Sequence, residues 1–66
     1  METITQYYFD VSIIHQYEDN DPYMTTHHYK TIYAPTVKDA FIKVAEWSEG
    51  MAKLYRKGEI KSITRM

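Results

Sequence analysis

Three histidines are the first residues to consider for chemistry, because imidazole is a common metal ligand. His27 and His28 are adjacent in the chain, and His15 precedes them. Neighbouring residues of a β-strand point to opposite faces, so His27 and His28 do not easily chelate one ion. His15 could lie across a hairpin from one of them, but no carboxylate spacing completes a zinc-type site. We therefore predict polar strand histidines, no metal and no other cofactor.

An acidic segment raises the possibility of a calcium loop. It contains Glu18, Asp19 and Asp21 and ends at Pro22. It lacks the glycine and the bidentate glutamate that a calcium-binding EF-hand loop needs. We interpret it as the tip of a β-hairpin. The functional alternative is an acidic contact point for a basic surface of a partner.

Enzymatic chemistry finds little support in the chain. No serine, histidine and carboxylate fall into a known nucleophile motif, and two glycines are too few for a phosphate-binding loop. A domain of 66 residues also has little room for a sheltered pocket. We predict that the protein is not an enzyme.

Tyrosine is the most informative residue type, with seven copies in 66 residues. We expect Tyr8, Tyr29 and Tyr33 to point away from the core and to form one patch. Tyrosine is enriched at interface hot spots, because it buries a large and rigid area. The structural alternative is cross-strand aromatic pairing that only stiffens a sheet.

Charge is divided unevenly along the chain. Residues 1–35 hold five acidic side chains, Glu2 included, against Lys30, whereas residues 36–66 hold seven basic and four acidic side chains. The acidic half repels phosphate, which makes nucleic acid an unlikely partner. The second half also contains a cluster of basic residues, for which three interpretations stay open: charge that stabilises the end of a helix, a contact for phosphate, or a contact for a partner protein. Its members are Lys53, Arg56, Lys57, Lys61 and Arg65.

The first half of the chain predicts a long hairpin. Residues 7–17 alternate with period two, which is typical of a half-buried strand, and residues 23–34 are rich in β-formers. We expect Ile32 and Ala34 to face a helix. The odd positions of the first strand are expected to face the core, and they are Tyr7, Phe9, Val11, Ile13, His15 and Tyr17.

The second half predicts one helix and one strand. Apolar residues recur at helical spacing over residues 37–57, with Thr36 as the N-cap and Asp39 completing the cap. Gly58 suits the position after the helix, and Gly50 is a possible break within it. Residues 59–65 then form an edge strand. The prediction is a single α+β domain, 1–66, with ββαβ topology, antiparallel sheet order 2-1-3 and one helix on one face.

Size limits the stability of such a domain. A small core supplies only about 3–5 kcal/mol, and without cysteine no disulfide can add to it. We therefore expect a homodimer, formed through the uncovered sheet face or through paired edges. The start of the chain shows no signal peptide, and apolar stretches reach at most three residues, so we predict a cytoplasmic protein without a membrane span.

One segment is similar to a known family. Residues 32–36 read Ile-Tyr-Ala-Pro-Thr, and Ala40 and Phe41 follow. This segment resembles the strand-to-helix junction of the short phage-encoded inhibitor of bacterial RNA polymerase. The resemblance runs without a gap over residues 32–41, and Ala45-Glu46-Trp47 matches a triplet of that family after a shift of one residue. It implies a three-stranded sheet crossed by one helix, and a protein that docks on the polymerase and blocks it.

The family also carries two arginines on its last strand that contact polymerase. The matching positions here are Ser62 and Thr64, with Arg65 on the other face. The candidate contact residues of this chain are therefore predicted from its own tyrosines, acidic segment and basic cluster, and not from that family. They are Tyr8, Tyr29, Tyr33, Glu18, Asp19, Asp21, Arg56, Lys61 and Arg65.

The expected function is that of a small phage-type effector. Such a protein binds a host protein and inhibits it by occupying a surface, without catalysis. Bacterial RNA polymerase is one candidate target and an antiphage-defence enzyme is another; if the chain is phage-encoded, it acts in the host cytoplasm. Two other classes stay open: a nucleic-acid-binding module, and a homo-oligomer that sequesters a small ligand.

Overall fold

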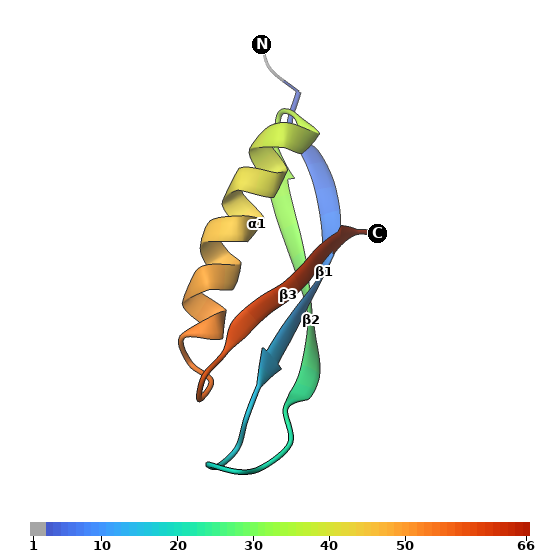
Figure 1. Cartoon of the computed structure of the whole chain (residues 1–66). Helices are drawn as coiled ribbons and strands as arrows, with labels where there is room; N and C mark the ends of the chain where they lie inside the picture. Colours follow the sequence, from blue (N-terminus) through green and yellow to red (C-terminus); the bar gives the residue numbers. More distant parts are fainter. Residues whose placement is uncertain (1–2) are drawn as a thin grey trace.

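The fold is a three-stranded antiparallel sheet with one helix on one face (Figure 1). The computed structural model describes residues 3–66; Met1 and Glu2, the latter counted above among the acidic side chains, lie outside this range. The elements are β1 (Thr5–His15), β2 (Met24–Ala34), α1 (Val37–Ala52) and β3 (Glu59–Arg65). The sheet order is β2-β1-β3, which confirms the predicted α+β class and ββαβ topology.

β1 is the central strand and supplies the core. Phe9, Val11 and Ile13 are fully buried, as the period-two pattern predicts. The strand begins and ends two residues earlier than expected, at Thr5 and His15. Tyr17 was expected in the core but is 72% exposed. The pairing stops because the Gln16 side chain turns into the hairpin loop and donates to the backbone oxygen of Asp21 at 2.6 Å.

β2 pairs with β1 along its whole length without a bulge. Tyr8 lies opposite Thr31 and Asp10 lies opposite Tyr29, so even positions of β1 share a face with odd positions of β2. The other face of β2 carries Ile32 and Ala34, both buried. The prediction that these two residues face the helix is confirmed by their place in the core cluster beside helix residues.

α1 begins as expected and ends early. The Thr36 hydroxyl accepts from the Asp39 amide at 3.2 Å, so the N-cap prediction is confirmed. Gly50 does not break the helix, but α1 stops at Ala52, and the predicted extent of residues 37–57 is wrong at its end. The chain must leave the helix there because Glu59 has to reach its partner Ile14 on β1.

The connection after α1 uses an unexpected residue for its turn. Lys57, not Gly58, adopts the left-handed conformation, with φ at 51°. Gly58 is needed for a different reason, since a Cβ built on it would lie 2.2 Å from the backbone oxygen of Ala52. Leu54, one of the apolar residues at helical spacing within residues 37–57, lies in this connection and is 77% exposed.

The molecule is thin and long, with principal extents of 53 × 18 × 13 Å. The lower end of the hairpin projects past α1 and β3 (Figure 1). The hydrophobic core lies between the sheet and α1, and the other face of the sheet carries no second layer within residues 3–66. The buried hydrophobic residues are Phe9, Val11, Ile13, Ile32, Ala34, Ala40, Val44 and Ala52.

Candidate functional site

The uncovered face of the sheet carries a group of exposed tyrosines. Tyr8 comes from β1, and Tyr29 and Tyr33 come from β2, with exposed fractions of 49%, 69% and 59%. Because Tyr8 pairs with Thr31, the two tyrosines of β2 are its diagonal neighbours, within reach of an aromatic side chain. All three thus lie on one face, as the alternation predicts.

Met66 completes this surface and was missed by the sequence reasoning. Its backbone amide donates to the carbonyl of Tyr8 at 2.9 Å, which continues the pairing of β3 with β1 by one residue. Its side chain is 68% exposed. No sequence signal identified it, because the predicted strand ended one residue earlier. We call Tyr8, Tyr29, Tyr33 and Met66 the outer patch.

The outer patch is hollowed rather than flat. A depression of about 290 Å³ is lined by Tyr8, Tyr29, Thr31 and Met66, with Phe9 and Lys30 also contributing. Next to the depression, the Tyr33 hydroxyl accepts from the side-chain amide (Nε2) of Gln6 at 3.1 Å, which fixes the ring against β1. A hollow among exposed rings suits an apolar side chain of a partner better than a large polar substrate.

A serine, a histidine and an aspartate also meet on the outer face. His27 Nδ1 lies 3.1 Å from Ser12 Oγ and 3.0 Å from Asp10 Oδ1. A nucleophile relay needs serine and carboxylate on the two different ring nitrogens, and here both share Nδ1. Ser12 is also only 5% exposed. The group is a cross-strand polar contact between β1 and β2, and it lacks the geometry of a catalytic triad.

The other histidines are held by side chains on the helix side of the sheet. His15 Nε2 lies 2.6 Å from Thr26 Oγ1, and its ring stacks on Tyr55 with a centroid distance of 4.3 Å. His28 Nε2 lies 2.8 Å from the Tyr55 hydroxyl. Tyr55 therefore covers the lower part of the sheet that the shortened helix leaves bare. Within residues 3–66, no group of three or more histidine, cysteine, aspartate or glutamate side chains is arranged to hold a metal ion.

The acidic tip and the basic cluster contact each other. Arg56 donates to the Asp19 carboxylate, and Lys57 Nζ lies 3.4 Å from the same oxygen. The backbone reinforces this contact, because the Gln16 amide donates to the Arg56 carbonyl at 3.1 Å. The acidic tip and the basic cluster, each predicted as a possible contact for a partner, thus bind each other within one molecule. Glu18 and Asp21 are exposed at the same tip.

Arg65 and Lys61 lie apart from the outer patch. The Arg65 guanidinium lies 5.1 Å from the centre of the Tyr7 ring, a cation–π contact on the helix side. Lys61 is exposed where the register between β1 and β3 shifts. The nine candidate residues therefore do not form one site: three build the outer patch, four lie at or against the hairpin tip, and two lie on β3.

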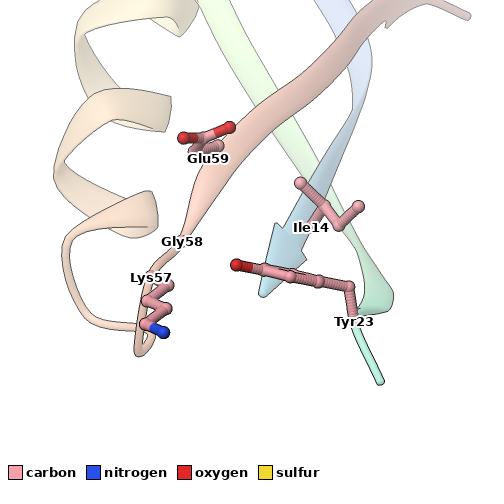
Figure 2. A pocket seen from close by; sticks show the side chains of 5 residues that line it. All are labelled: Ile14, Tyr23, Lys57, Gly58 and Glu59. Atoms are coloured by element: carbon pink, nitrogen blue, oxygen red, sulfur yellow. The ribbon is translucent and has the colours of Figure 1, made fainter. Parts of the chain in front are cut away.

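A second, larger depression lies beside the hairpin tip. Its volume is about 450 Å³, and Figure 2 shows Tyr23 reaching from the hairpin toward Gly58 and Lys57, with Ile14 beside it. Glu59 also lines the depression. The Lys57 ammonium in this lining is already engaged with the Asp19 carboxylate.

Comparisons with known families, proteins and structures gave no match. No protein-family model, no curated protein and no solved structure matches the chain. The resemblance over residues 32–41 stays a prediction. Among residues 3–66, no helix has the length and apolar character that crossing a membrane requires.

Proposed function

We propose that the protein is a small phage-type effector that binds a host protein through the outer patch and inhibits it by occupying a surface. The observation that carries this proposal is the hollow lined by Tyr8, Tyr29 and Met66, with exposed Tyr33 beside it, on a sheet face that residues 3–66 leave without a covering layer. Rigid aromatic rings around a depression are typical of interface hot spots. The proposed action needs no catalytic group and takes place in the host cytoplasm.

The candidate targets are bacterial RNA polymerase and an antiphage-defence enzyme. The resemblance of the junction at residues 32–41 supports a phage-type setting more than any one target. On last-strand contacts the chain differs from that family, since Ser62 and Thr64 stand where it has arginines. The outer patch is therefore the contact surface that we assign to this chain, whichever target it binds.

The test uses the tagged full chain and two variants. Tyr29→Ala combined with Tyr33→Ala removes the two most exposed rings of the outer patch. Tyr17→Ala is the matched control, because Tyr17 is 72% exposed at the hairpin tip and lies outside the patch. Purified RNA polymerase is tested first by binding and transcription assays, and partners captured from bacterial lysate are then identified and purified.

We expect the wild type and Tyr17→Ala to bind one partner in a fixed ratio and to inhibit its activity. The double variant should bind at least about thirtyfold more weakly, because the loss of even one hot-spot ring costs about 2 kcal/mol or more. Equal binding by all three proteins, or binding without inhibition, would contradict the proposal.

Nucleic-acid binding is the alternative that the same rings could serve, because bases stack on aromatic side chains. The charges near the outer patch do not favour it, since Asp10 lies on that face and Arg65 lies on the other. A gel shift at low salt with single-stranded DNA and RNA decides between the two. A complex that weakens steeply with salt would replace the proposed function.

A further inference from the structure

The free edge of β2 is open to pairing along most of its length. In an antiparallel pair, backbone groups of alternate residues point to the neighbouring strand and those between them point away. The Tyr8 carbonyl accepts from the Met66 amide, so the backbone groups of even-numbered β1 residues point toward β3. The odd-numbered β1 residues therefore point toward β2, where their partners in the register are even-numbered. The amides and carbonyls of Thr25, His27, Tyr29 and Thr31 therefore point outward from the sheet.

One side chain marks where this open edge ends. Lys43 Nζ donates to the carbonyl of Tyr33 at 3.0 Å. This contact agrees with an outward direction for the backbone groups of odd-numbered β2 residues, and it occupies the acceptor that Tyr33 would offer to another strand. The open edge is therefore the stretch from Thr25 to Thr31. It has no proline and no bulge, and it contains one lysine, Lys30, with no arginine, aspartate or glutamate.

The opposite edge of the sheet is protected in the usual ways. β3 has seven residues against eleven in β2, and its register with β1 shifts at Ser12 and Ile13. It also carries Glu59, Lys61 and Arg65. Short length, a bulge and charged side chains are the features that stop an edge strand from pairing with another chain. The molecule blocks one edge and leaves the other available.

We infer that two copies of the chain pair through β2 in antiparallel orientation and form a continuous six-stranded sheet. The four open positions are symmetric about His28, so a two-fold axis there places Thr25 opposite Thr31 and His27 opposite Tyr29 of the second copy. Every open amide then finds an open carbonyl. Of the two dimer arrangements predicted from the sequence, through the uncovered sheet face or through paired edges, this inference is the second.

Charge favours a second copy as the occupant of this edge. In the symmetric register Lys30 faces Thr26 of the second copy, so the two lysines do not stand opposite each other, and His28 faces His28 of the second copy. β2 contains no acidic residue, so it offers nothing specific to a basic segment, and a single lysine is a weak attraction for an acidic one. Three of the eight buried hydrophobic residues are alanines, and a core this small benefits from the added sheet.

The pairing also changes the binding surface. A two-fold axis perpendicular to a sheet puts both helices on one face and both outer patches on the other. Tyr29 and Tyr33 of each copy then flank the seam, and the second copy extends the surface that one molecule presents. The inference goes beyond the proposed function and does not depend on it, because it concerns the edge and not the target.

The first test measures molar mass and amide exchange on the unmodified chain. We expect a mass of twice 7.9 kDa at high concentration, falling to the monomer value on dilution. The amides of His27, Tyr29 and Thr31 should exchange slowly in the dimer and quickly after dilution. The amides of Ile63 and Arg65, which point outward on β3 by the same alternation, are the internal control and should exchange quickly throughout.

The second test uses proline, which removes one amide. Thr31→Pro is tolerated in a monomer because its lost N–H points to solvent, as proline on edge strands does. It should weaken self-association by about tenfold or more, since the symmetric dimer loses two hydrogen bonds. Thr31→Val loses the same hydroxyl but keeps the amide, and should dimerise like the wild type.

Three results would overturn the inference. They are a monomer at millimolar concentration, a dimer whose His27, Tyr29 and Thr31 amides still exchange quickly, and a Thr31→Pro dimer as stable as that of Thr31→Val. Circular dichroism checks that the proline variant is folded, and Thr25→Pro, near the start of the strand, replaces it if it is not. Thr25→Pro separates the two claims, because Thr25 does not line the hollow: loss of dimerisation with intact target binding by this variant would leave the proposed function standing.

Discussion

The two glycines meet opposite constraints, and alanine separates them. A Cβ at Gly58 would lie 2.2 Å from the backbone oxygen of Ala52, and backbone cannot move aside without reshaping the turn. At Gly50 nothing lies within 4 Å of the added carbon, and the site is inside α1. The same substitution therefore has opposite expected signs at the two positions.

We predict that Gly58→Ala lowers the free energy of unfolding by about 1–3 kcal/mol, the usual cost of forced overpacking. Gly50→Ala should raise it by roughly 0.5–1 kcal/mol, because alanine is the better helix former. Urea unfolding of both variants beside the wild type measures the two changes. A stabilising Gly58→Ala would mean that the turn after α1 is looser than described.

Single-residue features were predictable where strand or helix geometry decided them. The outward direction of Tyr8, Tyr29 and Tyr33 follows from alternation, and the Thr36 cap follows from its side chain. The contact of His27 with Asp10 and Ser12 was not foreseen, because it depends on the register of the hairpin. That register places Ser12 opposite His27, and the chain between the strands does not reveal it.

At the level of elements, the helix start is set by local chemistry and its end by pairing elsewhere. The Thr36 hydroxyl satisfies an amide that has no partner within the helix. The apolar spacing continues in phase to Tyr55, which is why the sequence predicted a longer helix. β3 has to begin opposite Ile14, and this requirement overrides the local preference. Tyr55 is still used, but from a loop and over His15.

We predict that Thr36→Ala lowers the free energy of unfolding by about 1 kcal/mol, the typical value of an N-cap hydroxyl. Thr36→Ser keeps the accepting oxygen and should stay within about 0.5 kcal/mol of the wild type. Thermal and urea unfolding of the three proteins provides the comparison. Equal losses in both variants would show that the threonine methyl group, not the hydroxyl, matters at this position.

On the scale of the whole molecule, opposite charges in the two halves of the chain meet at one end. Asp19 on the hairpin tip receives Arg56 and Lys57 from the connection between α1 and β3. The uneven charge distribution was evident from the order of the residues in the sequence. The pairing was not, because it needs the tip and the connection to fold to the same place.

We predict that Asp19→Asn lowers the free energy of unfolding by at most about 1 kcal/mol at low salt, because all three side chains are well exposed to solvent. The difference from the wild type should shrink in about 1 M salt, where charges are screened within a few ångströms. Asp21→Asn is the control, since Asp21 joins the tip through its backbone oxygen. A loss that salt leaves unchanged would indicate that the contact acts through shape rather than charge.

The central place of β1 has a consequence for how the protein is made. Ribosomes deliver β1 first, yet one of its two neighbours, β3, is delivered only after the hairpin and the helix. Until then, one side of β1 offers bare amides and carbonyls beside its most apolar residues. A nascent chain paused before Glu59 is therefore the form that a chaperone would hold and a protease would cut.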